Sequence, residues 1–271
     1  MNNSYLMVAG DKQNHLDKLG SLKCHMAIVN LEDGVYDKDF ARQLVYDYLK
    51  SKDNKNIIVR VNELSTCGKE DIKIINQLKP KAIRVAKIKN TKDVQIALEL
   101  IDEDIEVHLS IETKEAFSTL ETLKISPRVT TVYLGILDLL ESLELPQSLV
   151  KLDNPTIDYI LSRFLISSKI ATFKAVSFVY QDYKNLEEFT SWCKKEKELG
   201  FTSKVCISPA QVDIVNKIHL IAEEELQKAL YIKEVFEKNK ENKNTAIKDE
   251  LYGFIDEPIY KDALLFIKNN R

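Results

Sequence analysis

The polar residues best suited to chemistry follow short apolar runs along the chain. Glu112 and Asp138 come after two consecutive runs, and Glu32 comes after an earlier one. Carboxylates that converge at neighbouring strand ends repel each other unless a cation or a proton lies between them. Mg²⁺ suits such a pair, because it takes oxygen ligands and uses few protein carboxylates beside water and substrate. A single acid at a strand end is more simply interpreted as a helix cap. Several acids together with an arginine at the same edge favour a functional site, because a helix cap does not require an arginine.

Arg60 supplies that arginine, between two valines in the run VRVN. A buried guanidinium needs an anion, which is either an internal carboxylate or a substrate held by two parallel hydrogen bonds. The sequence leaves both interpretations of Arg60 open. Lys87 could carry Schiff-base chemistry, although the neighbouring Lys89 and Lys92 favour a solvated lysine. Cys206, in the run VCI, is expected in the core.

Eight apolar runs would position these residues, and segments with helical spacing separate them. The runs begin near Tyr5, Met26, Asn56, Ala82, Glu106, Val129, Lys174 and Lys204. Their Val and Ile content and continuous apolar character are typical of strands buried on both faces. Eight strand–helix units over about 220 residues predict an α/β fold, a (β/α)₈ TIM barrel, rather than an open sheet. The carboxyl ends of the strands would then bring the polar residues to one mouth.

The chain after the eighth run has a different pattern. We predict a barrel over residues 1–221, carrying the active site, and a C-terminal helical extension over residues 222–271. Residues 223–236 have the spacing of an amphipathic helix, and residues 237–244 are polar and charge-mixed, as in a solvated linker. Apolar character returns over residues 251–267. That segment either packs on a neighbouring subunit or returns to its own barrel, and length alone favours neither.

Composition narrows the function classes. With 39 basic and 42 acidic residues the net charge is −3, which gives no reason to expect nucleic acid or an anionic membrane as partner. No apolar run is long enough to span a bilayer. The four cysteines have no metal-ligand spacing, and no signal peptide is evident, so we expect a cytoplasmic protein with reduced thiols. Glycines are scarce, and Gly135 falls at a predicted strand exit, where the backbone turns or approaches a ligand.

At these residues the sequence resembles the citrate lyase β-subunit family, within the wider group of HpcH/HpaI aldolases. The resemblance runs nearly end to end. Its pieces are VAGD (8–11), NLEDGV (30–35), VRVNELST (59–66), SIET (110–113), LGILDL (134–139) and LGFTSKVCISPAQVDIVN (199–216). Each motif alone is weak, but the ordered set is specific. The family fold is a (β/α)₈ barrel, in agreement with the interpretation of the strand pattern.

The resemblance also implies roles for individual residues. Glu112 and Asp138 would hold Mg²⁺, and Arg60 would contact the substrate near the breaking bond. Glu32 would lie beside the metal site and take part in catalysis. Gly135 and Asp138 would also contribute to substrate binding.

The tail of the chain carries one further candidate. Asp256 lies in FIDEP (254–258), which resembles a family tail whose aspartate completes the site of a neighbouring subunit in some relatives. A turn residue before Pro258 is the plainer interpretation. Family likeness also favours a homo-oligomer, a trimer or larger.

The implied reaction is cleavage of a carbon–carbon bond in a 3-hydroxy-acyl thioester of the citryl, malyl or citramalyl type. The carrier would be coenzyme A or an acyl carrier protein, and the products a small 2-oxo acid and a shorter acyl thioester. Two alternatives stay open, a class II pyruvate-type aldolase acting on free hydroxy-oxo acids and a divergent, non-catalytic barrel subunit. They are motivated by departures from the family pattern, which fall at Ala9, Ala86, Leu137, Ser177, Phe178 and Ser208.

Overall fold

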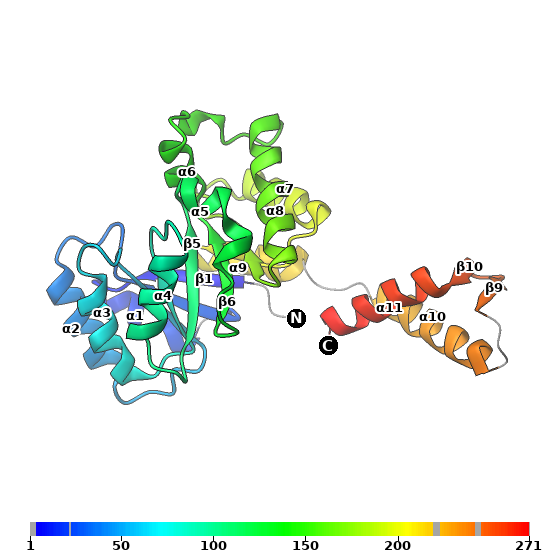
Figure 1. Ribbon diagram of the computed structural model, residues 1–271, viewed down its shortest axis with the longest axis horizontal. Coiled ribbons are helices and arrows are strands. Elements are labelled where there is room, and N and C mark those ends of the chain that lie inside the picture. The colour runs from blue at the N-terminus through cyan, green and yellow to red at the C-terminus, as the bar shows by residue number, and fades with distance from the viewer. Residues whose placement is uncertain (1–3, 22, 219–222, 242–244, 271) are drawn as a thin grey trace. The chain divides into compact units, whose positions relative to one another are not determined.

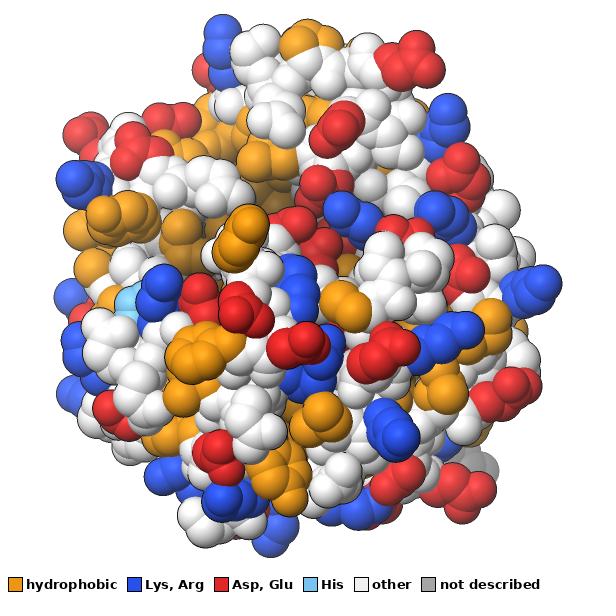
Figure 2. Space-filling model, turned by 90° about the vertical axis from the view of Figure 1, so that its left-hand side faces the viewer, with side chains coloured by type: hydrophobic (Ala, Val, Ile, Leu, Met, Phe, Trp, Pro, Cys, Tyr) orange, Lys and Arg blue, Asp and Glu red, His pale blue; other side chains and the backbone are white. Residues whose placement is uncertain are grey.

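The computed structural model describes residues 4–21, 23–218, 223–241 and 245–270. The chain forms two compact units, which divide between Ile218 and His219 and are described separately (Figure 1). Within the described residues, no helix is both long enough and apolar enough to cross a bilayer. Acidic and basic side chains are interspersed over the face shown in Figure 2, in keeping with the balanced composition.

Eight parallel strands build the first unit. They are β1 (Ser4–Ala9), β2 (Met26–Asn30), β3 (Ile57–Val61), β4 (Ala82–Val85), β5 (Glu106–Ile111), β6 (Val129–Leu134), β7 (Lys174–Val176) and β8 (Lys204–Cys206). Their spatial order is β7-β6-β5-β4-β3-β2-β1-β8. A bridge between Ser177, just after β7, and Lys204 in β8 joins the two ends of the sheet. The predicted TIM barrel and all eight predicted strands are confirmed.

Helices lie between successive strands and cover the outside of the barrel. They are α1 (Gln13–Leu16), α2 (Lys38–Leu49), α3 (Gly68–Ile75), α4 (Thr91–Leu100), α5 (Lys114–Ser118), α6 (Ile136–Ser142), α7 (Pro155–Ile170), α8 (Leu186–Leu199) and α9 (Pro209–Ile218). The side chains of Asp37, Asn90, Thr113, Asn154 and Asn185 accept hydrogen bonds from amides of the first turn of their helices. Such caps satisfy donors that have no partner inside the helix, and so fix where it begins.

Two apolar clusters fill the barrel unit. The larger lies between sheet and helices. It contains Trp192, Cys193 and also Cys206, which the sequence predicted to be in the core. The smaller fills part of the interior with residues drawn mostly from strand starts, including Tyr5, Met26 and Ile58. Because it packs the amino-terminal end of the barrel, the opposite end is left for a site.

The second unit is a helix, a hairpin and a second helix. They comprise α10 (Glu223–Glu241), β9 (Ala246–Asp249) paired antiparallel with β10 (Gly253–Asp256), and α11 (Glu257–Asn270). A cluster of its own, with Phe236, Ile247 and Ile255 buried, holds these elements together. The hairpin is a difference from the purely helical extension that the sequence predicted.

The prediction of a linker over residues 237–244 is wrong for residues 237–241, because α10 continues to Glu241. Glu and Lys are good helix formers, and no Gly or Pro interrupts the stretch. Burial of Phe236 and a hydrogen bond from the Tyr260 hydroxyl to Glu237 Oε1 (2.9 Å) anchor this end of the helix. Residues 242–244 lie outside the described residues.

Candidate active site at the carboxyl ends of the strands

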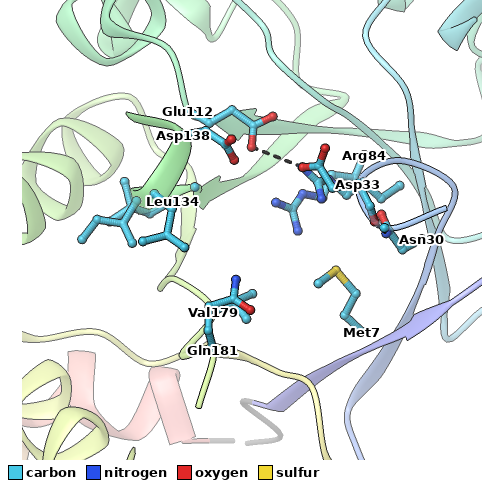
Figure 3. A pocket seen from close by; sticks show the side chains of 14 residues that line it. Met7, Asn30, Asp33, Arg84, Glu112, Leu134, Asp138, Val179 and Gln181 are labelled. Atoms are coloured by element: carbon cyan, nitrogen blue, oxygen red, sulfur yellow. Dashed lines mark hydrogen bonds and ion pairs between the residues drawn. The ribbon is translucent and has the colours of Figure 1, made fainter. Parts of the chain in front are cut away.

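A cavity of about 310 Å³ lies at the carboxyl end of the barrel. Its charged lining consists of three acids, Asp33, Glu112 and Asp138, and two arginines, Arg60 and Arg84. Figure 3 shows Asp33, Arg84, Glu112 and Asp138 above Met7, Val179 and Gln181, with Glu112 and Asp138 side by side. Acids and arginines from, or just after, the five neighbouring strands β2 to β6 thus share one small volume.

Arg60 is the centre of the charged network. Its Nη2 lies 2.8 Å from Glu32 Oε2, 3.3 Å from Glu112 Oε2 and 3.5 Å from Asp33 Oδ2. Burial opposes its charge, but Glu112 and Glu32 outweigh burial and raise the pKa of Arg60. Arg60 therefore forms internal ion pairs and also lines the cavity, so the two roles that the sequence left open are compatible.

Glu112 is free to face the cavity because its neighbour performs the capping. Thr113 Oγ1 accepts from the amide of Ala116 at the start of α5. Glu112 Oε1 accepts from the Lys87 amide at 2.7 Å, which leaves Oε2 towards Arg60. The helix-cap interpretation therefore does not hold for Glu112.

Gly135 makes room for Glu112. A Cβ at this position would lie 2.6 Å from both Cβ and Oε2 of Glu112. Any larger residue would push the carboxylate away. Gly135, which the sequence predicted to lie where the backbone turns or approaches a ligand, thus allows the position of Glu112, the predicted metal ligand.

Asp138 lies in the first turn of α6 and completes a carboxylate pair with Glu112. Burial, the charge of Glu112 and that of Asp33 together raise the pKa of Asp138. A divalent cation would relieve this repulsion, and two carboxylates are the usual protein share of a magnesium site. Within the described part of the chain no cluster of three or more His, Cys, Asp or Glu side chains is arranged for a metal, so water and substrate would supply the other ligands.

Glu32 lies behind Arg60 rather than in the cavity lining. Burial raises the pKa of Glu32 to about 7, while the charge of Arg60 opposes the shift. Its Oε2 also accepts from the Asp33 amide at 2.6 Å. These contacts suit a residue that holds Arg60 in position.

Lys87 does not have the environment of a Schiff-base lysine. Its Nζ lies 3.6 Å from Glu32 Oε1, and the side chain is 37% exposed. Burial alone would lower the pKa of Lys87, but Glu32 and Asp33 raise it above the ordinary value. An amine nucleophile needs the opposite shift, so the solvated-lysine interpretation is favoured.

Asn62 supports the site from outside the cavity. Its Nδ2 donates to Leu31 O at 3.0 Å and to Asp71 Oδ2 at 2.7 Å, and Asp71 is held by Arg42 Nε at 2.8 Å. The loop that carries Glu32 and Asp33 is thereby fixed to the start of the β3–α3 loop. Gly68 belongs to the same packing, since a Cβ there would lie 2.2 Å from Asn62 O.

A sequence model of the family described as HpcH/HpaI aldolase/citrate lyase matches residues 3–209. The chain belongs to this family. Among curated relatives, a (3S)-malyl-CoA thioesterase of Cereibacter sphaeroides is 28% identical over 83% of this chain and 80% of that protein. The citrate lyase subunit beta of Leuconostoc mesenteroides subsp. cremoris is 24% identical over 97% of this chain and 91% of that protein.

Solved structures of the citrate lyase type share the fold. The protein CitE of Mycobacterium tuberculosis, in complex with magnesium, acetoacetate and coenzyme A, has a TM-score of 0.80 at 20% identity and covers 98% of this chain and 97% of that chain. The predicted resemblance is therefore confirmed, and with it the enzyme class, a carbon–carbon lyase of the HpcH/HpaI group.

Several positions that depart from the family pattern have local structural roles. Ser208 Oγ accepts from the Gln211 amide (3.3 Å) at the start of α9, and Phe178 packs edge-on against Trp192 at 5.1 Å. Leu137 lines the cavity, whereas Ala86 is buried. None of the four displaces Glu112 or Asp138 from the cavity.

Asp256 belongs to the second unit, as the last residue of β10. Its Oδ1 accepts from the Ile259 amide at 3.1 Å, in the first turn of α11. It therefore begins a helix rather than sitting in an isolated turn. Its catalytic role stays a prediction.

Arg84, which lines the cavity beside Arg60, was not predicted from the sequence. The two arginines are partners in the β3–β4 register, so their side chains lie on the same face of the sheet. The available signal was the charged residue within the apolar run AIRVA, the same signal that singled out Arg60.

Proposed function

We propose that this protein is a Mg²⁺-dependent carbon–carbon lyase that cleaves a 3-hydroxy-acyl thioester of the citryl, malyl or citramalyl type into a 2-oxo acid and a shorter acyl thioester. The observation that carries the proposal is the pair Glu112 and Asp138 in one cavity with Arg60. The CitE structure, with its magnesium, acetoacetate and coenzyme A, and the thioester-acting relative support the substrate class.

The carboxylates of Glu112 and Asp138 would hold the metal. When bound, Mg²⁺ supplies Lewis-acid polarisation to the carboxylate and the oxygen of the 2-oxo acid portion. Gly135 contributes by allowing Glu112 to keep its place, and it lines the cavity that would hold the acid.

Arg60 would stabilise the charge that develops as the carbon–carbon bond breaks. A base takes the proton from the 3-hydroxyl, the bond electrons move towards the thioester carbonyl, and an enolate oxygen forms there. A fixed guanidinium aimed at that oxygen lowers the barrier, and protonation of the enolate carbon then gives the acyl thioester. Glu32, at 2.8 Å, holds Arg60 in position.

A base must take the proton from the 3-hydroxyl group. Asp256 is our candidate, supplied by the second unit of a neighbouring copy in a homo-oligomer, a trimer or larger. Resemblance of FIDEP to the family tail is what supports it. Coenzyme A or an acyl carrier protein would carry the acyl group.

Hydrolysis of a malyl thioester is a second candidate, favoured by the similarity to (3S)-malyl-CoA thioesterases. Products separate the candidates. The lyase releases a 2-oxo acid and an acyl thioester, and the thioesterase releases free thiol and a hydroxy acid. An aldolase on free acids needs no thioester, and a non-catalytic barrel turns over none of these substrates.

Calorimetric titration of the full chain tests the metal site directly. We expect Mg²⁺ to bind, and Mg²⁺ to strengthen the binding of oxaloacetate and of pyruvate. The variant Glu112→Gln keeps the shape of the side chain but loses the charge, so it should not bind Mg²⁺, and Mg²⁺ should not strengthen its binding of either acid. Equal binding by this variant and the wild type would refute the proposed site.

A further inference from the structure

Arg84 is a buried cation whose partners are neutral. Its side chain is almost fully enclosed, with the residue 4% exposed. Nε donates to Ser110 Oγ at 2.8 Å, and the guanidinium lies over the Tyr133 ring with its Cζ 4.1 Å from the centroid. Among the described residues no carboxylate lies within ion-pair distance of it, since Glu32, Asp33 and Glu112 are engaged by Arg60 instead.

One nitrogen of Arg84 has no partner at all. Nη1 is buried, and no described atom accepts a hydrogen bond from it. Arg84 also lines the cavity, so an anion entering the site reaches a guanidinium that the protein has already positioned. An uncompensated buried charge is costly, and a planar guanidinium is best satisfied by a carboxylate.

The strand register sets the depth of this group. Arg84 pairs with His108 across β4 and β5, whereas Glu112 comes after the end of β5 and Asp138 after the end of β6. The backbone of Arg84 thus lies further from the mouth than the carboxylate pair. A substrate chelated through one end at Glu112 and Asp138 would direct its other end towards Arg84.

We infer that Arg84 binds a second carboxylate of the substrate, so that the 2-oxo acid released is a dicarboxylate of the oxaloacetate type and not a monocarboxylate such as pyruvate. This inference rests on the proposed function for the identity of the substrate. What carries it is a guanidinium with an unpartnered Nη1 in the lining of a cavity that already holds a carboxylate pair.

The test uses the full chain and two stable acids, malate and lactate. They share the 2-hydroxy-carboxylate end and differ in the distal carboxylate, and neither decarboxylates as oxaloacetate does. With Mg²⁺ present, the wild type should bind malate about 10- to 100-fold more tightly than lactate, the range for one charge-assisted contact. In Arg84→Met this preference should vanish, with lactate and Mg²⁺ affinities unchanged.

Folding does not confound this comparison. Arg84→Met exchanges a charge without a carboxylate partner for an apolar side chain of similar length, so its melting temperature should equal or exceed that of the wild type. Arg84→Lys keeps the charge without the planar fork and should retain part of the preference. Equal loss of malate and lactate binding in Arg84→Met, or an unchanged preference, would overturn the inference.

A metal-free arm separates this inference from the proposed function. Without Mg²⁺, malate at tens of millimolar should raise the melting temperature of both the wild type and Glu112→Gln, but not that of Arg84→Met. If Mg²⁺ fails to bind yet this pattern holds, the proposed function falls and the carboxylate site at Arg84 stands. If the malate effect persists in Arg84→Met, the inference is wrong whatever the metal does.

Discussion

The position of the Glu112 side chain, which follows β5, depends on the absence of a Cβ atom at Gly135, which follows β6. A Cβ at position 135 would lie 2.6 Å from Glu112 Oε2. We therefore expect Gly135→Ala to displace the carboxylate and weaken Mg²⁺ binding about 10- to 100-fold, as for other disturbances of metal-ligand orientation. Calorimetry measures this. Gly20→Ala is the matched control, because nothing lies within 4 Å of the added Cβ; equal Mg²⁺ affinity in both variants would contradict the argument.

At this scale the sequence indicated most of the site. Arg60 stood out as a charge between valines, and the acids stood out after apolar runs. Arg84 carried the same signal and was missed, because its partner Arg60 is adjacent only through the β3–β4 register. Local patterns identify which side chains are unusual, whereas the distances of 2.8 to 3.5 Å around Arg60 depend on strand pairing that no local pattern contains.

Among the elements, β5 and β6 share a polar network inside the barrel. The Tyr133 hydroxyl lies 3.0 Å from His108 Nδ1, and His108 Nε2 lies 3.4 Å from Glu106 Oε2. If the hydroxyl donates to Nδ1, the other ring nitrogen donates to Glu106. Thr130 Oγ1 donates to the same carboxylate at 2.7 Å, and Lys81 forms an ion pair with it. The network ties these two strands to the residue preceding β4.

This network predicts a pH dependence of stability. The pKa of Glu106 is lowered to about 2. The hydrogen bond from His108 contributes most to this shift, and burial of Glu106 opposes it. A carboxyl with a depressed pKa in the folded state stabilises the fold above its unfolded value, near 4.5, and loses that contribution as pH falls towards 2. Glu106→Gln should therefore lower the melting temperature above pH 4.5, with the difference closing towards pH 2. Thermal unfolding across this range checks it, and a constant difference between the two proteins would count against the network.

The type of an element, helix or strand, was predictable wherever a long stretch of sequence had regularly spaced apolar residues. The eight strands and the main helices followed from runs that are buried on both faces or along one stripe. The hairpin of β9 and β10 was not predictable, because each of its strands has four residues and only one buried side chain. The end of α10 was misjudged because Lys- and Glu-rich sequence suits an exposed helix as well as a linker.

The whole molecule poses a question that neither unit answers alone. The barrel carries Glu112 and Arg60, and the second unit carries Asp256 at the start of α11. Each unit has an apolar core of its own. If the tail of one copy completes the site of another, catalysis requires an oligomer in which each active site draws on two chains.

Mixing two inactive variants tests that arrangement. Asp256→Asn keeps a side chain able to cap α11, so lost turnover would report the carboxylate and not an unfolded tail. Glu112→Gln removes a carboxylate that we propose as a metal ligand, so it should inactivate the barrel site. Each variant alone should be inactive with malyl or citryl thioesters. Co-expressed in random hetero-oligomers, they should recover roughly a quarter of wild-type activity, because a site that joins an intact barrel to a neighbour's intact tail occurs about once in four.

Mixing the purified proteins without subunit exchange gives the baseline. Inactivity of the co-expressed pair would place Asp256 in its own chain's site, and full activity of Asp256→Asn alone would remove it from the mechanism.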